Sequence, residues 1–192
     1  MSQRAAVFLD RDGVINELVP DPRTGVPESP YDPADVRLTA GAAEALEVLR
    51  DTEFAVVVAS NQPAAAKGTA SAAALDAVHA RVVELLGSAA DVVDEWRYCR
   101  HHPDALDPAL RDCECRKPRP GMLLDAAAAL DLDLTASWMV GDADRDIAAG
   151  HAVGCKTVLV ENPESVHRRE GNAGEDLRAP DLPSAIRAII GA

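Results

Sequence analysis

Short apolar runs alternate with segments of helical periodicity along most of the 192-residue chain. Continuous apolar runs are typical of strands that are buried on both sides, and their alternation with helices is typical of a parallel sheet covered on both faces. The expected strands span residues 5–9, 55–59, 92–98, 137–140 and 157–160, and the expected helices span 41–50, 71–87, 122–130, 147–151 and 182–190. We therefore predict an α/β protein, a Rossmann-like three-layer αβα sandwich with a central parallel sheet.

Two segments interrupt this alternation. Residues 17–40 form a proline-rich stretch that is too long for a plain connector. Residues 164–181 are charged and contain glycines, which is the composition of a mobile segment. A chain of 192 residues has the length of one domain, so we expect residues 1–192 to form a single domain.

Polar residues follow several of the expected strands, at the edge of such a sheet where ligands bind. Asp10-Arg11-Asp12-Gly13 follows the first strand, Ser60-Asn61-Gln62 follows the second, Gly141-Asp142 follows the fourth, and Arg116-Lys117 lies in a cysteine-rich loop. The carboxyl ends of parallel strands meet at one edge of the sheet. We therefore expect these four segments to converge on one pocket.

Asp10 and Asp12 are separated by one residue at the end of a strand, so both carboxylates point to the same side. This spacing suits a division of roles in which Asp10 attacks phosphorus as a nucleophile and Asp12 acts as general acid and base. Gly13 permits the tight turn that follows. The pair alone fits a solvated acidic turn equally well.

Two carboxylates would repel a phosphate group unless a divalent cation lies between them. Asp142 is the natural third oxygen ligand beside Asp10 and Asp12. Oxygen ligands with room for water and phosphate favour Mg²⁺. We therefore expect a catalytic Mg²⁺ held by these three residues.

The remaining polar residues at the strand ends suit a phosphate group. We expect Ser60 and Asn61 to hold phosphate oxygens, and Lys117 to add a compact positive charge. Asp146 is placed to support Lys117 or a metal-bound water. Taken singly, these residues are also ordinary caps, turn formers and surface charges.

Residues 98–116 carry a second group of metal-ligating side chains. Two close pairs, separated by eleven residues, provide three sulfurs and one nitrogen: Cys99, His101, Cys113 and Cys115. Such a set can enclose a tetrahedral Zn²⁺ and stabilise its loop, although one residue between ligands is fewer than usual. His102 is the competing nitrogen ligand, and buried thiols or a redox pair are the alternatives. We expect Cys155 to be a small buried apolar residue.

Charge and composition limit the classes of molecule that the protein can bind. The 19 Lys and Arg residues against 32 Asp and Glu residues give a net charge of −13, which repels nucleic acid. No apolar stretch reaches the ~20 residues of a membrane-spanning helix, and no signal-peptide pattern is seen at the start. We expect a cytoplasmic monomer that acts on a small molecule, with no nucleic-acid or membrane partner.

Residues 10–16, 60–62, Lys117 and 141–146 resemble the four motifs of the haloacid dehalogenase superfamily. The resemblance implies that Asp10 is the nucleophile and that Asp12 is the acid/base and a Mg²⁺ ligand through its backbone carbonyl. It also implies a phosphate grip by Ser60 and Lys117, a metal-ligating Asp142 and a second acid, Asp146, near the lysine and the metal.

Residues 98–103 and 113–122 further resemble the zinc-containing, nearly capless heptose bisphosphate phosphatases of this superfamily. The resemblance implies Mg²⁺-dependent loss of the 7-phosphate from D-glycero-D-manno-heptose 1,7-bisphosphate, a minimal cap or none, and a substrate-facing loop over residues 17–40. Histidinol-phosphate phosphatases share the nucleophile motif and a similar zinc loop, and another small sugar phosphate is a further alternative. The sequence Pro120-Gly121-Met122 favours the heptose group.

The chain departs from the heptose pattern after Gln62, where Pro63-Ala64-Ala65-Ala66-Lys67-Gly68 replaces a segment that usually contains glycine and arginine. We expect Lys67 to replace that arginine as a phosphate anchor and Arg116 to bind a second anionic group, although Arg116 also fits a solvent-facing charge. A non-catalytic metal-binding module is the competing class of function. An intact nucleophile motif argues against it, because a binding module needs no nucleophile.

Overall fold

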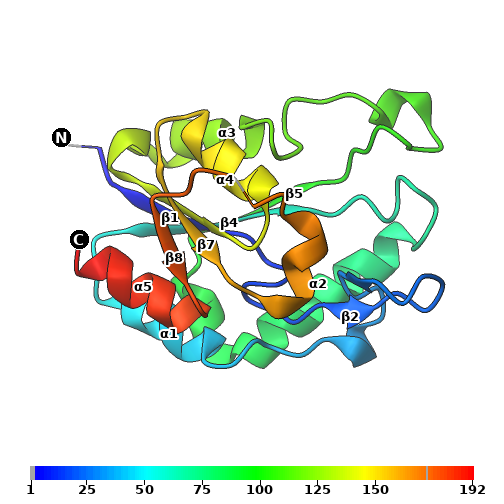
Figure 1. Cartoon of the computed structure of the whole chain (residues 1–192), viewed down its shortest axis with the longest axis horizontal. Helices are drawn as coiled ribbons and strands as arrows, with labels where there is room; N and C mark the ends of the chain where they lie inside the picture. Colours follow the sequence, from blue (N-terminus) through cyan, green and yellow to red (C-terminus); the bar gives the residue numbers. More distant parts are fainter. Residues whose placement is uncertain (1–2, 172) are drawn as a thin grey trace.

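The computed structural model describes residues 3–171 and 173–192, which form a six-stranded parallel sheet with helices on both faces (Figure 1). Its strands are β1 (Ala6–Leu9), β4 (Ala55–Asn61), β5 (Glu95–Cys99), β6 (Trp138–Gly141), β7 (Lys156–Val160) and β8 (Leu177–Ala179), in the order β5-β4-β1-β6-β7-β8. Phe8 of β1 is paired with Val57 of β4 on one side and with Met139 of β6 on the other. The strands that follow β1 in the sequence are thus added first on one side of it, as β4 and β5, and then on the other, as β6, β7 and β8. Such a reversal of strand order opens a crevice at the carboxyl end of β1.

Five α-helices flank the sheet in the described residues. Helices α3 (Gly121–Leu130) and α4 (Asp144–His151) lie above it in Figure 1, whereas α1 (Ala42–Arg50), α2 (Ala72–Leu86) and α5 (Leu182–Ile190) lie below it. Short 3₁₀ helices link these elements: η1 (Pro33–Asp35), η2 (Gly87–Val92), η3 (Pro108–Leu110), η4 (Leu134–Ala136) and η5 (Pro163–Arg168). The predicted α/β sandwich is confirmed.

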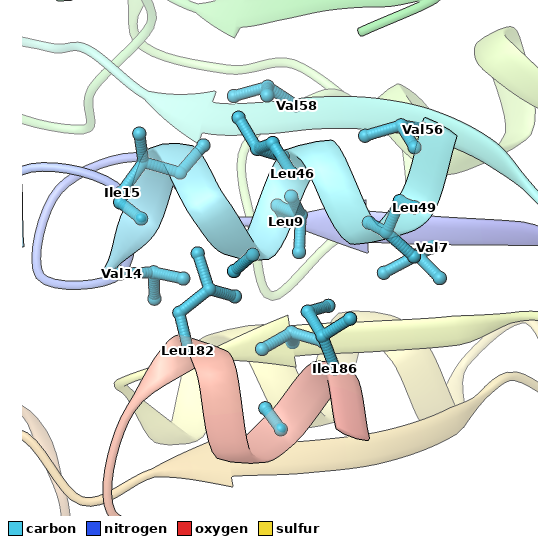
Figure 2. Packing of buried hydrophobic residues seen from close by; sticks show 14 of the residues in the cluster. Val7, Leu9, Val14, Ile15, Leu46, Leu49, Val56, Val58, Leu182 and Ile186 are labelled. Carbon is cyan, nitrogen blue, oxygen red and sulfur yellow. The ribbon is translucent and has the colours of Figure 1, made fainter. Parts of the chain in front are cut away.

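The two cores follow from the alternation of side chains along each strand. Val7 and Leu9 of β1 point toward α1 and α5, where Leu46 and Ile186 meet them (Figure 2). Phe8, between them in the sequence, belongs to the opposite core. Full burial of one such aliphatic side chain contributes about 1.5–3 kcal/mol to stability.

Helix α2 shows how the sequence specifies an element. The Ser71 hydroxyl accepts a hydrogen bond from the Ala74 N–H and caps the first turn. Four apolar side chains at helical spacing are buried: Leu75, Val78, Val82 and Leu86. Helix α4 begins at Asp144, three residues earlier than predicted, because the Asp146 carboxylate accepts from the Ala143 N–H and caps it.

Both interruptions of the predicted pattern contain regular structure. Residues 17–40 form a hairpin of β2 (Val19–Pro20) and β3 (Pro27–Glu28), followed by η1. The prediction of a mobile segment over 164–181 is wrong for its described residues, which provide most of η5 and all of β8. Composition describes the average of a segment, so it does not reveal a strand of only three residues. This strand, β8, is stabilised by pairing with β7 of the central sheet. None of the helices in the described part of the chain is long and apolar enough to cross a membrane.

Candidate active site

The structure brings the four motif segments together at the carboxyl end of β1. The Asp10 N–H donates to the Val140 carbonyl across the β1–β6 boundary at 2.9 Å, which holds Asp10 directly beyond its strand. Ser60 comes from β4, and Asp142 directly follows β6. All three side chains are buried.

Lys117 lies at the centre of this group and is 1% exposed. Its Nζ lies 3.1 Å from Asp10 Oδ1 and 2.7 Å from Asp146 Oδ1, and it donates to the Ala59 carbonyl at 2.6 Å. Burial acts to lower the pKa of Lys117, but the carboxylates of Asp10 and Asp146 outweigh it and raise that pKa. The ammonium group therefore stays charged at neutral pH.

Asn61 holds the backbone at Lys117. Its side-chain amide donates to the Lys117 carbonyl at 3.0 Å, and its Oδ1 accepts from the Lys117 N–H at 3.1 Å. Both ends of the amide are thus engaged with the chain. The structure places Asn61 as a support for Lys117, and its predicted contact with phosphate stays a prediction.

Three buried carboxylates, those of Asp10, Asp142 and Asp146, each bring one oxygen to within 4.8 Å of the others. Burial is the main reason why the pKa of Asp142 rises to about 7, and the negative charges of Asp10 and Asp146 add to it. Burial also raises the pKa of Asp10, with Lys117 opposing that shift. Asp142 Oδ1 is buried and has no hydrogen-bond partner among the described residues. Three crowded oxygen ligands, one of them unpartnered, fit a divalent cation such as Mg²⁺.

Gly13 leaves room for the Asp142 carboxylate. A Cβ at this position would collide with Asp142 Oδ2, and the backbone of Gly13 is left-handed, with φ of 91°. Both facts require glycine here. The predicted turn at Gly13 is therefore also a space for the neighbouring strand's carboxylate.

The Asp12 carboxylate lies outside this trio and is held by other groups. Its Oδ1 accepts from Arg11 Nη2 and from Asn16 Nδ2, both at 2.9 Å, and its Oδ2 accepts from Gln62 Nε2 at 2.5 Å. Burial acts to raise the pKa of Asp12, but the Arg11 guanidinium and these hydrogen bonds outweigh it and lower that pKa. The Gln62 amide also donates to Ser60 Oγ at 3.0 Å, so it links the acid/base candidate to the phosphate-binding candidate.

The four zinc candidates form one cluster, with their ligand atoms within 4.8 Å of one another: Cys99, His101, Cys113 and Cys115. Cys99 Sγ lies 3.7 Å from Cys113 Sγ, and Cys115 Sγ lies 3.4 Å from His101 Nδ1. Three thiols and one imidazole are the donor set of a closed structural zinc site. His102 faces elsewhere, because its Nδ1 accepts from the Asp104 N–H at 3.0 Å.

Three further predicted residues lie outside these clusters. Arg116 Nη1 donates to the His101 carbonyl at 3.2 Å, so it links the backbone just before Lys117 to the zinc cluster. Lys67 is exposed on the wall of a cavity of 180 Å³ between the β2–β3 hairpin and the segment after Gln62. Cys155 is buried in the core beside α3, as predicted.

Several residues at the site were not singled out from the sequence: Arg11, Asn16, Arg145, Ser165 and Arg168. The first three lie inside the motif segments, so their positions were visible although their contacts were not. Ser165 donates its hydroxyl hydrogen to Asp142 Oδ2, and Arg168 Nη1 lies 3.8 Å from the same oxygen. No local pattern marks these last two, because the fold alone brings η5 against the end of β6.

Comparison with known proteins agrees with this geometry. The family model described as HAD-hydrolase-like matches residues 114–185. The D-glycero-β-D-manno-heptose-1,7-bisphosphate 7-phosphatase of Pseudomonas aeruginosa is 37% identical over 163 residues, which cover 85% of this chain and 84% of that protein. The enzyme of the same name from Escherichia coli K12 is 34% identical over 187 residues, covering 95% and 93%.

A solved structure extends the similarity to the whole fold. The D,D-heptose 1,7-bisphosphate phosphatase of Bordetella bronchiseptica, crystallised with magnesium and phosphate, matches with a TM-score of 0.75 and 30% identity over 97% of this chain and 98% of its own. With relatives above 30% identity over most of both chains, the protein belongs to the HAD-like phosphatases that include the heptose bisphosphate phosphatases, and it is a phosphoric monoester hydrolase.

Proposed function

We propose that this protein is a Mg²⁺-dependent phosphatase that removes the 7-phosphate of D-glycero-D-manno-heptose 1,7-bisphosphate through an aspartyl-phosphate intermediate. The observation that carries the proposal is the buried Asp10 beside Lys117, Asp142 and Asp146. A carboxylate nucleophile needs such an arrangement, in which nearby positive charge neutralises the phosphate group that it attacks. The relatives named for this reaction support the choice of substrate.

Asp10, Asp142 and Asp146 would hold the magnesium ion. When bound, the ion neutralises negative charge on the transferring phosphoryl group. Lys117, at 3.1 Å from Asp10 Oδ1, adds a fixed positive charge on the same side. The predicted backbone contact of Asp12 with the metal belongs to this proposal.

In the first step, Asp10 attacks phosphorus, the bond between phosphorus and the sugar oxygen breaks, and Asp12 gives a proton to the leaving oxygen. The Arg11 N–H donates to Asp10 Oδ1 at 2.7 Å, and Lys117 contacts the same oxygen, which leaves Oδ2 for the attack. Asp12 needs a proton for this step. A phosphate dianion bound beside Asp12 raises its pKa, because a nearby like charge favours the neutral acid.

In the second step, water attacks the phosphorus of the phosphorylated Asp10, and the bond between phosphorus and Asp10 breaks. Asp12, now ionised, takes the proton from the attacking water. Phosphate leaves and the Asp10 carboxylate is restored. The hydrogen bonds from Arg11, Asn16 and Gln62 to Asp12 stabilise its ionised form between the two steps.

The rest of the substrate would lie toward the 180 Å³ cavity beside the β2–β3 hairpin. Lys67 lines this cavity, and Arg116 donates a hydrogen bond to the carbonyl of His101 in the zinc cluster. Both are cations, so both suit the phosphate that stays on the sugar. The zinc cluster itself, with four protein ligands, suits a structural role for residues 98–116.

The test is phosphate release measured with Mg²⁺ across heptose 1,7-bisphosphate in both anomeric forms, fructose bisphosphate and histidinol phosphate. We expect one heptose anomer to have the highest kcat/KM. Asp10→Asn is the control: it keeps the shape of the side chain and should reduce phosphate release by at least ~10³-fold, because the nucleophile is lost.

Preference for histidinol phosphate would overturn the proposed substrate while leaving the reaction class in place. Substantial turnover by Asp10→Asn would overturn the covalent mechanism. A folded wild-type protein that releases no phosphate from any of these esters would favour another small sugar phosphate as the substrate.

A further inference from the structure

Arg168 is a nearly buried arginine that joins two parts of the active site. Its side chain is 6% exposed, with Nη1 3.8 Å from Asp142 Oδ2 and Nη2 2.9 Å from Glu28 Oε2. Glu28 is the last residue of β3, and Asp142 follows β6, so the arginine bridges the substrate-side hairpin and the carboxylate trio. Its guanidinium is thus shared between a buried carboxylate and a partly exposed one, whose side chain is 42% exposed.

When all three carboxylates are ionised, three nearby cations match their charge without a metal ion, and one of these cations, Arg168, is shared with Glu28. The carboxylates of Asp10, Asp142 and Asp146 face three cations: Lys117 at 2.7–3.1 Å from two of them, Arg168 beside the third, and the largely buried Arg145, whose pKa all three carboxylates help to raise against burial. A bound Mg²⁺ adds two positive charges to this balanced set. A phosphate dianion, with a charge of about −2, restores the balance.

The two oxygens of Asp142 also have different surroundings. Oδ2 accepts from the Ser165 hydroxyl and faces Arg168, whereas the buried Oδ1 has no hydrogen-bond partner among the described residues. The unpartnered oxygen suits a metal ligand. Arg168 therefore lies on the opposite oxygen of the same carboxylate, where its charge repels a metal ion without occupying the metal's place.

We propose that Arg168 is a positioning residue that acts as an internal counter-ion to Asp142: it weakens Mg²⁺ binding to the empty site and makes Mg²⁺ and phosphate bind together. Glu28 sets the strength of this effect, because it draws the guanidinium toward the hairpin and away from Asp142. The inference rests on the magnesium site of the proposed function, but on no particular sugar substrate.

The first measurement is Mg²⁺ binding by calorimetry, without phosphate and then with saturating inorganic phosphate. Arg168→Gln keeps a polar side chain and removes the charge, so it should tighten Mg²⁺ binding without phosphate by roughly tenfold, the scale of a typical coupling between sites. The gain in Mg²⁺ affinity that phosphate produces should shrink in the same variant. Arg50→Gln is the matched control, because it removes one positive charge from an exposed ion pair on α1, and it should change neither value.

Glu28→Gln should act in the opposite direction and weaken Mg²⁺ binding by roughly fivefold, because Arg168 is released toward Asp142. The same change in the Arg168→Gln background should have almost no effect. This double-mutant cycle separates an action through Arg168 from the direct attraction of Glu28 for a cation, which would be the same in both backgrounds. Thermal unfolding of each variant checks the fold, and the partly exposed Glu28 keeps the test available even where Arg168→Gln is unstable.

Unchanged or weaker Mg²⁺ binding in a folded Arg168→Gln variant would overturn the inference, and so would equal effects of Glu28→Gln in the two backgrounds. These outcomes are read from Mg²⁺ affinity alone. They are therefore distinct from a failure of the substrate proposal, which would appear as a change of preferred ester with the Mg²⁺ affinities as expected.

Discussion

At the scale of single residues, Asp142 shows a clear conflict between burial and charge. The side chain is fully buried, and two further carboxylates lie close to it. Burial and these charges raise its pKa from 3.8 to about 7 in the metal-free protein. The folded protein therefore binds a proton on Asp142 more tightly than the unfolded chain does.

This difference predicts a pH dependence of stability. Stability from Asp142 is fully present below about pH 4, where the carboxyl is neutral in both states, and is lost as pH rises from about 4 to about 7. Asp142→Asn removes the titration. In magnesium-free buffer we expect the variant to exceed wild type by a few kcal/mol, roughly, at pH 8 and by little at pH 4, as measured by urea unfolding.

Magnesium should reverse the order at pH 8, because only wild type has the third carboxylate ligand. A variant that is less stable than wild type at pH 8 without magnesium would contradict the raised pKa. A constant difference between pH 4 and pH 8 would contradict it equally.

At the scale of elements, the loop over residues 98–116 has little apolar packing of its own. Between β5 and α3 its regular structure is the single turn η3, and Leu106 is 72% exposed. The Cys/His cluster joins the end of β5 to Cys113 and Cys115, close before Lys117. A metal ion bound by this cluster would fix the backbone at Cys115 and so the position of Lys117, two residues later.

We therefore expect removal of zinc by a chelator to lower the melting temperature by several degrees and to reduce phosphate release. Cys113→Ser should do the same and lower the zinc content below one ion per chain, because a hydroxyl is a poor zinc ligand. Cys155→Ala is the matched control, since Cys155 lies in the core and should leave zinc content unchanged. An unchanged melting temperature after complete zinc removal would argue against a structural metal.

At the scale of the whole molecule, one sheet separates two apolar cores, and every strand of that sheet pairs with the next. We propose, from this continuity, that the chain is one domain and predict a single cooperative unfolding transition. Trp96 lies on the edge strand β5 and Trp138 on the inner strand β6, so they report from different parts of the sheet. In each of the variants Trp96→Phe and Trp138→Phe, the urea midpoint measured by fluorescence should coincide with the midpoint measured by circular dichroism. Separate midpoints for the two probes of one variant would indicate independent units.

Hydrophobic periodicity was enough to predict the central sheet and the helices that cover it, because buried strands and amphipathic helices leave patterns in the residues themselves. One boundary differs from the prediction: β5 begins at Glu95, three residues later than predicted, because residues 87–92 continue α2 as a 3₁₀ helix. The strand β8 was missed, since its three residues are stabilised by pairing with β7 and by the Asp176 carboxylate, which accepts from the Thr157 N–H at 2.7 Å.

The sequence by itself determined the positions of Asp10, Asp12, Ser60 and Asp142, because each lies at the end of an apolar run or within three residues beyond it, and the edge of a parallel sheet gathers such ends. Only the tertiary structure decided which partners these residues have. It placed His101 in the cysteine cluster and turned His102 away, held the Asp12 carboxylate on Arg11, and brought Arg168 between Asp142 and Glu28. The physical reason is range: a motif records neighbours along the chain, whereas Arg168 meets Glu28 across 140 residues, and no local pattern encodes such a contact.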